Sequence, residues 1–429
     1  MTINYIVSIS IFLLLFIFIC TEKIHKTIVS MICAALMVIF GIFRGFYSPD
    51  KVMQAIDFNT LGLLIGMMII VNHLKQTGIF NYLSIKLSKL SKGNSLYLFI
   101  FLTTITAIIS MWIDNVTTLI LIGPITILIT NTLGISSLPF LIGEAFLSNI
   151  GGAGTMIGDP PNIIIGSESG LSFNSFIVHL MPPTIIMMIV TIIVFCIIFR
   201  KEFEKNKKNI EHIMSMDEYE AIKKSKGLKR CAIVLLITIA LFFLHQKLEI
   251  PLSFIAFFGA SLLLLLMRPN LEEILQKVEW PSLFFFMSLF IIVGGIENTG
   301  LLKIIGAKIL PLAQTNIVLC AIYLFWISII LSAITNNISF TIAIVPIIKH
   351  ISITIPNANI LWWALALGAA FGANGTPIGS TANIIAISIS EKTKYPITFK
   401  NWIKYATFPL FIGCIVISLI LLCFPNLFN

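Results

Sequence analysis

Long apolar stretches separated by short polar loops dominate the sequence. Ten of them, five before residue 200 and five after residue 230, approach the roughly 20 residues that a helix needs to cross a bilayer. They lie near Ile3–Cys20, Thr27–Phe43, Thr60–Leu74, Leu138–Ile165 and Phe176–Phe199, and near Cys231–Leu244, Leu252–Met267, Leu283–Glu297, Ile360–Ile389 and Ile403–Phe424. The pattern predicts an all-α integral membrane protein with ten crossings.

Shorter pairs of apolar arms lie between the third and the fourth crossing of each half, with a polar tip inside each pair. The arms are Leu96–Trp112 with Val116–Ile129, and Ile317–Leu331 with Ile338–Ile348. Such arms fit a re-entrant hairpin, which enters and leaves the membrane on one side, better than two complete crossings. We therefore expect re-entrant hairpins at residues 96–130 and 317–349.

A stretch with spaced lysines precedes each hairpin. Gly78–Lys92 and Gly300–Ala313 place Lys among apolar residues, as helices that lie in the membrane interface do. We expect these two stretches to form amphipathic helices that frame the hairpins.

The second half of the chain repeats the first. Asn115 aligns with Asn337 at a shift of 222 (337 − 115), and Asn162 aligns with Asn383 at 221 (383 − 162) after one deletion. Each copy holds five crossings and one hairpin, and an odd number of crossings predicts two inverted-topology repeats. The expected organisation is a first membrane repeat (1–199) with a broken helix at 138–165, a linker (200–230), and a second membrane repeat (231–429) with a broken helix at 360–389.

The basic residues favour one orientation of these repeats. With the N-terminus outside, 22 of the 28 Lys and Arg residues fall on the cytoplasmic side, as the positive-inside rule requires. The sequence therefore predicts a multi-pass protein of the cell inner (cytoplasmic) membrane, with both termini outside and the linker in the cytoplasm.

Composition narrows the class of protein further. Of the residues, 58% are hydrophobic and 11% charged, whereas soluble domains carry about a quarter charged residues. This excludes a soluble enzyme and makes membrane lipid, not nucleic acid, the expected surrounding. The seven Cys lie in apolar stretches without metal-site or disulfide-framework spacing, so no metal site is expected from them.

Polar residues interrupt the apolar pattern at four places, two in each repeat. The hairpin tips read Asp114-Asn115-Val116-Thr117-Thr118 and Thr335-Asn336-Asn337-Ile338-Ser339, and the broken spans carry Gly158-Asp159-Pro160-Pro161-Asn162 and Gly379-Ser380-Thr381-Ala382-Asn383. Non-helical backbone at membrane depth is tolerated only inside protein or beside a water-filled cavity, and paired breaks in inverted repeats are typical of a midplane binding site. The residues expected at this site are Asp114, Asn115, Thr117, Thr118, Thr155, Gly158, Asp159, Asn162, Asn336, Asn337, Ser339, Thr376, Gly379, Ser380 and Asn383.

Two interpretations of the polar residues stay open. Asp114 aligns with Asn336 and Asp159 with Ser380, and Asp, Asn and Ser all cap helices well. Only the first repeat supplies carboxylates, however. A carboxylate inside the membrane costs roughly 2.5 kcal/mol or more and usually marks an ion or proton pathway. We expect Asp114 and Asp159 to carry a proton, with Na⁺ as the alternative.

Three further acids have expectations of their own. Asp57 and Glu279 align at the beginning of equivalent spans, where a carboxylate stabilises the helix dipole. Glu144 lies in the broken span without an acidic counterpart, so it is expected either to face the cavity or to bind a helix cap.

The motifs resemble those of a known superfamily. Asp114-Asn115-Val116-Thr117-Thr118 and Gly151-Gly152-Ala153-Gly154-Thr155-Met156-Ile157-Gly158-Asp159-Pro160-Pro161-Asn162 are similar to motifs of the arsenite-permease and melanosomal P-protein branch of the ion-transporter superfamily. That superfamily, with its citrate-transporter-like domain, also holds sodium/proton antiporters of the NhaD type and dicarboxylate carriers. The resemblance covers nearly the whole chain. It implies a scaffold part and a transport part, a homodimer and elevator-like alternating access, and it leaves a cytoplasmic ATPase partner open.

The leading hypothesis is a secondary active transporter that couples protons to a small inorganic oxyanion or its neutral acid, with arsenite or antimonite as the named candidate. A Na⁺/H⁺ antiporter is the alternative, because two carboxylates beside helix breaks can bind Na⁺. A di- or tricarboxylate carrier is less favoured, since Asp114-Asn115-Val116 and Asn336-Asn337-Ile338 depart from the Ser-Asn-Thr tips of that branch. An intramembrane aspartyl protease, which pairs two acids, is disfavoured because two prolines follow Asp159 and the aligned Asn336 and Ser380 are not acids. No enzymatic role or cofactor beyond the coupling ion is expected.

Overall fold

The computed structural model describes residues 2–21, 24–204, 218–219, 222, 225–355, 358–391 and 393–428. These residues form α-helices and short 3-10 helices, with no strand among them. Nine of the described helices are long and apolar enough to cross a membrane. The protein is therefore an all-helical, multi-pass membrane protein, as the apolar pattern predicts.

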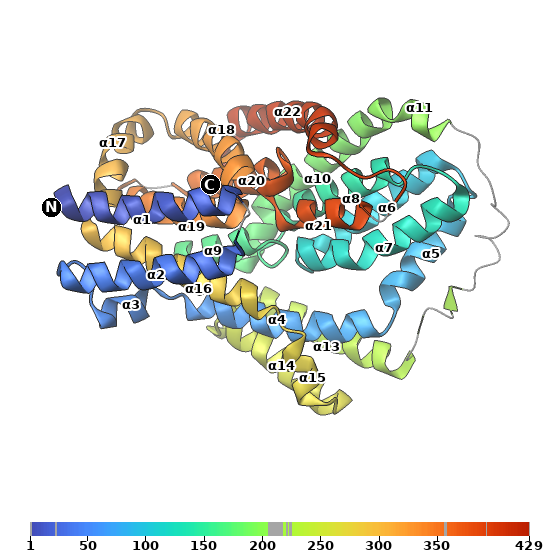
Figure 1. The fold of residues 1–429 in the computed structure, drawn as a ribbon, viewed down its shortest axis with the longest axis horizontal. Coiled ribbons are helices and arrows are strands. Elements are labelled where there is room, and N and C mark those ends of the chain that lie inside the picture. Colours follow the sequence, from blue (N-terminus) through green and yellow to red (C-terminus); the bar gives the residue numbers. More distant parts are fainter. Residues whose placement is uncertain are drawn as a thin grey trace.

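The helices of the two halves follow the same order along the chain (Figure 1). The first half contains α1 (Thr2–Thr21), α2 (Lys26–Phe43), α3 (Pro49–Ala55), α4 (Phe58–Gln76), α5 (Ile79–Leu90), α6 (Ser95–Ser110), α7 (Asn115–Leu133), α8 (Leu138–Gly152), α9 (Pro160–Ser169), α10 (Phe173–Ile198) and α11 (Arg200–Phe203). The second contains α13 (Ser225–Leu248), α14 (Leu252–Met267), α15 (Leu271–Gln276), α16 (Trp280–Thr299), α17 (Leu301–Thr315), α18 (Ile317–Thr335), α19 (Asn337–Thr354), α20 (Asn359–Gly372), η2 (Pro377–Gly379), α21 (Thr381–Ser390), α22 (Phe399–Cys423) and η3 (Pro425–Phe428).

Helices of one half pack on helices of the other. α2 packs along α16, and the equivalent helices α14 and α4 pack in the same way. The α4–α14 contact is close because Gly66 meets the backbone of Ala256, where an added Cβ would lie 2.7 Å from the carbonyl carbon. Small residues at a contact let membrane helices approach closely. The two halves are therefore interleaved.

The hairpins pack equally closely against the broken helices. α6 lies along α8, and α18 lies along α20. A Cβ at Gly151 would come within 2.2 Å of the Ala107 carbonyl oxygen, and one at Gly372 within 2.5 Å of the Ile329 carbonyl oxygen. Gly151 and Gly372 are equivalent at the 221 shift and their partners at the 222 shift. The internal repeat thus extends to individual backbone contacts.

Both predicted interruptions of the long spans are present. Residues 153–159 separate α8 from α9, and residues 373–380, which include η2, separate α20 from α21. The hairpins α6–α7 and α18–α19 lie toward opposite ends of the longest axis in Figure 1. By length and composition alone α7, α18 and α19 would suffice to cross a membrane. Re-entrant insertion and the inverted orientation of the repeats therefore stay predictions.

The two amphipathic stretches form helices α5 and α17, each next to its hairpin. Each begins after a glycine in the left-handed region, Gly78 at φ +81° and Gly300 at φ +88°, a conformation that glycine adopts without steric cost. α5 packs against α6 and α7, and α17 packs against α18 and α19. They contact the hairpins as expected.

The predicted linker lies largely outside the described residues, including Ser215. Its Glu218 forms an ion pair with Lys89 of α5. The hydrogen bond from Lys89 holds the pKa of the Glu218 carboxyl below its ordinary value.

The helix pattern differs from the sequence-based expectation in two respects. The short helices α3 and α15 were not indicated, because they are too short to show a period, and each begins at a polar cap, Ser48 or Asn270. α13 begins at Ser225, within the predicted linker.

Candidate functional site

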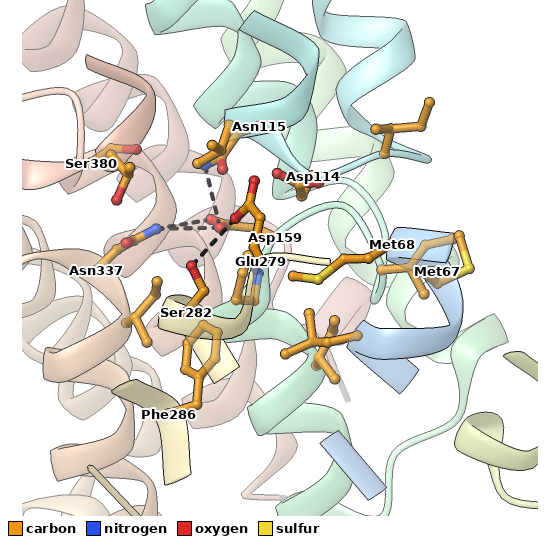
Figure 2. A pocket seen from close by; sticks show the side chains of 18 of the residues that line it. Met67, Met68, Asp114, Asn115, Asp159, Glu279, Ser282, Phe286, Asn337 and Ser380 are labelled. Atoms are coloured by element: carbon orange, nitrogen blue, oxygen red, sulfur yellow. Dashed lines mark hydrogen bonds between the residues drawn. The ribbon is translucent and has the colours of Figure 1, made fainter. Parts of the chain in front are cut away.

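A cavity of about 810 Å³, including its mouth, lies where both hairpin tips meet both helix breaks. It reaches the beginnings of α2 and α16 and is walled on one side by Met67 and Met68 of α4 (Figure 2). Its polar lining residues are Lys26, Asp114, Asn115, Asp159, Glu279, Ser282, Asn337, Ser380 and Thr381. The cavity therefore draws on both repeats.

Asp159 is the buried carboxylate at the centre of these polar residues, with 1% of its surface exposed. Asn337 donates its side-chain amide to both carboxylate oxygens, at 3.1 and 3.3 Å, and Asn115 donates to Oδ1 at 3.4 Å. Figure 2 shows the two amides approaching Asp159 from different sides. One amide comes from each hairpin tip, so the carboxylate joins the two repeats.

The interpretation of Asp159 as a helix cap is wrong. Asp159 occupies the position before α9, but its side chain makes no capping hydrogen bond. The two hairpin amides hold the carboxylate at the cavity instead. A sequence cannot show this difference, because the competing donors come from distant parts of the chain.

The capping interpretation is confirmed for the other three aligned residues. Asp114 accepts a hydrogen bond from the Thr117 backbone N–H at 2.9 Å. Asn336 accepts one from Ile338 and Ser380 one from Ala382, both at 3.2 Å. Asp114 and Ser380 also line the cavity, so their capping role coexists with a place at the site.

Several predicted site residues lie behind the cavity wall and hold the non-helical backbone. The Asn162 amide donates to three carbonyls of the first break, among them Thr155 at 2.8 Å, and the equivalent Asn383 donates to Ala373 and Thr376 in the second. The hydroxyls of Thr155 and Thr376 donate to the carbonyls of Met111 and Ala333, near the ends of α6 and α18. These bonds satisfy backbone groups that would otherwise be unpaired inside the membrane.

Gly158 and Gly379 serve the same breaks by allowing close backbone approach. A Cβ at Gly158 would lie 2.7 Å from the Gly152 carbonyl oxygen, and one at Gly379 would lie 2.4 Å from that of Ala373. Neither glycine lines the cavity. Glycine therefore occupies both positions because a larger side chain would collide with the neighbouring backbone.

The remaining predicted residues sit beside the tips. Thr118 donates to the Ile113 carbonyl at 3.4 Å, and Thr117 contributes the N–H that Asp114 caps. Ser339 is buried and its hydroxyl has no hydrogen-bond partner. Asn336 lines a neighbouring hollow that it shares with Lys26 and Thr381.

Glu279 lies at the start of α16, as the helix-dipole interpretation expects, and it also lines the cavity. It makes no capping hydrogen bond at α16, and its carboxylate accepts from the Ser282 hydroxyl at 3.3 Å on the cavity wall. Its counterpart Asp57 does cap α4, through Asn59 and Thr60 at 3.0 and 3.1 Å. Both carboxylates thus lie at helix starts, as the helix-dipole interpretation expects, but only Asp57 makes capping hydrogen bonds.

Three further residues at or behind the cavity were not predicted from the sequence: Lys26, Thr381 and Asn149. Lys26 donates to the Thr381 hydroxyl at 2.9 Å across the cavity. Asn149 lies fully buried in α8 behind Asn115 and Ser380. An asparagine in the interior of an apolar span is a usable signal, whereas the place of Lys26 depends on how the repeats meet.

Glu144 neither lines the cavity nor caps a helix, so both expectations for it are wrong. It is fully buried in α8, where the Thr126 hydroxyl donates to one of its oxygens at 2.5 Å. Its other carboxylate oxygen has no partner.

The charges at the cavity are unequal in number. Asp114, Asp159 and Glu279 supply three carboxylates, and Lys26 is the one cationic side chain among the described lining residues. No three His, Cys, Asp or Glu side chains in the described part of the chain group closely enough to hold a metal ion. Carboxylates and amides that converge at paired helix breaks inside a membrane bundle are typical of the binding site of a transporter.

Comparison with known families agrees with this class. Residues 16–368 match the citrate transporter (CitMHS) family, so the chain belongs to that family and is a transporter, not an enzyme. The resemblance to the superfamily branch that includes the melanosomal P protein is confirmed as well.

Two relatives show how far the similarity extends. An uncharacterized transporter of Mycobacterium tuberculosis is 38% identical over 400 residues, which cover 92% of each chain. The human P protein is 28% identical over 478 residues, which cover 92% of this chain and 57% of the longer P protein.

A solved structure shares the fold. The YdaH transporter of Alcanivorax borkumensis, described as having an unusual topology, superposes with a TM-score of 0.65 at 11% sequence identity. The match covers 95% of this chain and the whole of the other. At this identity the likeness concerns the fold alone.

Proposed function

We propose that the protein is a secondary active transporter that couples protons to the movement of a small inorganic oxyacid, with arsenite or antimonite in neutral acid form as the first candidate. The observation that carries the proposal is the buried Asp159 carboxylate, which faces the cavity and is held by one amide from each hairpin tip. A carboxylate inside a membrane bundle is the usual carrier of a proton.

The cavity charges favour a solute that arrives without negative charge. Three carboxylates against one ammonium repel a free anion, and repulsion between charges is strong where little water separates them. A neutral trihydroxy acid can donate its hydroxyls to Asp159 and Glu279 and accept from the amides of Asn115 and Asn337. Citrate, which the family description names, carries three carboxylates at neutral pH and is the less favoured substrate.

Na⁺/H⁺ exchange is the second candidate, and the same excess of carboxylates favours it. Asp114, Asp159 and Glu279 line one cavity, and a hard cation prefers oxygen ligands of this kind.

Elevator-like alternating access is part of the proposal. The cavity extends to Lys26 and Glu279, which the predicted topology places on the cytoplasmic side. At the other end α9 packs against α4, and α19 packs against α16. This arrangement fits a state that is open to the cytoplasm and closed to the outside.

Uptake into proteoliposomes under an imposed pH gradient tests the proposal. Arsenite, antimonite, phosphate, sulfate, citrate, succinate and Na⁺ are compared at two pH values, with protein-free liposomes as the control. We expect gradient-driven flux of arsenite or antimonite and none of citrate. Flux of Na⁺ alone selects the second candidate, and citrate flux overturns the proposal. Flux driven by the gradient alone also means that no cytoplasmic ATPase is required.

A further inference from the structure

Asn149 makes four side-chain hydrogen bonds in the buried space between the two repeats. Its Oδ1 accepts from the Asn115 amide and from the Ser380 hydroxyl, both at 2.9 Å. Its Nδ2 donates to the side-chain oxygens of Asn374 at 2.8 Å and Asn383 at 2.9 Å. An Asn side chain offers two donors and accepts about two hydrogen bonds, so Asn149 is fully satisfied.

The two side chains that donate hydrogen bonds to Asn149 line the cavity, whereas Asn149 itself does not. Asn115 and Ser380 line the cavity, one at the first hairpin tip and the other at the second helix break. Asn149 lies behind them with none of its surface exposed. It therefore contacts the site through these two side chains.

Asn149 also shares the Asn115 amide nitrogen with Asp159. The Asn115 amide lies 2.9 Å from the Asn149 oxygen and 3.4 Å from the nearer Asp159 oxygen. An ionised carboxylate accepts hydrogen bonds more strongly than a neutral group does. Protonation of Asp159 therefore weakens its hold on Asn115 and leaves that amide with Asn149.

The internal repeat has no second copy of this arrangement. At the 221 shift Asn149 corresponds to Ala370 (149 + 221). In the first break the side-chain oxygen of Asn162 has no partner, whereas the equivalent oxygen of Asn383 accepts from Asn149. The asparagine therefore does not follow from the duplicated architecture alone.

We propose that Asn149 is a positioning residue of the transport site, which orients Asn115 and Ser380 and, through the shared Asn115 amide, links the protonation of Asp159 to the second helix break. This inference rests on the proton coupling proposed above.

Other charged groups face Asp159, and none of them is substituted in the test described below. Among the described residues lining the cavity they are Asp114 at the start of α7, Glu279 at the start of α16 and Lys26 at the start of α2. None of the three is hydrogen-bonded to Asn149. A change that follows from substituting Asn149 therefore acts through its own hydrogen-bond partners, of which Asn115 and Ser380 line the cavity.

The experiment compares the pH at which uptake is half-maximal in Asn149→Ala and Asn115→Ala proteins. Removing Asn149 leaves the Asn115 amide to the ionised Asp159, so the half-maximal pH falls. Removing Asn115 takes a donor from ionised Asp159, so the half-maximal pH rises. In the double variant, Asn149→Ala adds no further shift, because the Asn115 amide through which it acts on Asp159 is already absent. The effects of substituting contacting residues are not additive. We also expect KM to rise in Asn149→Ala on the order of three- to tenfold, as for the loss of one or two hydrogen bonds.

Asn374→Ala is the matched control. Asn374 is as buried as Asn149 and bonded to it, and its amide donates to the Phe146 carbonyl at 3.3 Å. It does not line the cavity. We expect Asn374→Ala to lower thermal stability without moving the pH profile. Asn149→Ser is the second variant should Asn149→Ala not fold, with a smaller shift in the same direction.

The outcomes separate this inference from the proposed function. An Asn149→Ala profile that coincides with those of the wild type and Asn374→Ala overturns the positioning role, as does an additive double variant. If wild-type uptake does not respond to pH, proton coupling fails instead. The test of Asn149 then rests on the KM of the Asn149→Ala protein. A KM that rises in Asn149→Ala but not in Asn374→Ala supports the positioning role, and an unchanged KM overturns it.

Discussion

At the scale of single residues, substitutions of Asp159 test its ionic role without removing a helix cap. Because its side chain caps nothing, Asp159→Asn and Asp159→Ala are both expected to remove the pH dependence of transport without the loss of a helix cap. Uptake at a series of pH values, together with thermal unfolding in detergent, measures both effects. An unchanged pH profile in both variants would mean that the proton is carried elsewhere.

Asp114 offers the complementary case, because it does cap α7. Asp114→Ala is expected to lose about 0.5–2 kcal/mol of stability, while Asp114→Asn, which restores the residue type of Asn336, keeps the cap. Thermal unfolding of the two variants tests this difference. Equal stabilities would show that the cap contributes nothing.

Prediction from sequence succeeded for residues whose polarity contradicts their surroundings. Asp114, Asn115, Asp159, Asn337 and Ser380 interrupt apolar spans, and all five line the cavity. Their separate roles could not be predicted, because a cap and a cavity carboxylate use the same residue types. The place of Glu279 at the cavity was not predicted for a related reason: its position at a helix start fits the helix dipole whether or not a cavity lies beside it.

At the scale of helices, the α4–α14 contact depends on Gly66. A methyl group there would lie 2.7 Å from backbone and side-chain carbons of Ala256, so Gly66→Ala is expected to cost about 1–3 kcal/mol by overpacking. Gly123→Ala is the control, because its Cβ would meet only the flexible ends of Ile389 and Leu141, at 3.3 and 3.6 Å. A melting temperature lowered in Gly66→Ala but not in Gly123→Ala is the expected result, and equal melting temperatures would contradict it.

The broken helices and hairpins were predictable at this scale because apolar length and polar interruption both leave a sequence signal. The interruptions at 153–159 and 373–380 lie where the motifs placed them. The helix partners could not be predicted. Packing of α2 on α16 and of α4 on α14 depends on small residues and surface shape, which a repeat alignment does not show.

At the scale of the whole molecule, the orientation in the membrane stays a prediction that labelling can test. A cysteine at Ser215 in the linker, in a background whose native cysteines are unreactive, is expected to react with an impermeant thiol reagent only after cells are opened. The imbalance of basic residues is the reason. Labelling in intact cells would reverse the assigned orientation.

A second whole-molecule prediction follows from the aligned pairs Asp57–Thr60 and Glu279–Ser282. In each pair the hydroxyl donates to the carboxylate, but Ser282 lines the cavity while Thr60 is fully buried. If the repeats exchange roles during transport, Ser282→Cys and Thr60→Cys should show opposite changes in thiol reactivity when the pH gradient is reversed. Parallel changes, or a Thr60→Cys that never reacts during transport, would contradict this exchange.

The interleaved packing of the two halves also has a consequence for biogenesis. α4 is synthesised before its partner α14. Gly66 precedes Ala256 by 190 residues (256 − 66), so at roughly 5–20 residues per second the delay is about 10 to 40 s. During that time Gly66 lies at an uncovered helix surface, as do the α2 residues that later contact α16. The first half synthesised alone should therefore be a target for membrane proteases, and the second half supplied as a separate polypeptide should rescue it.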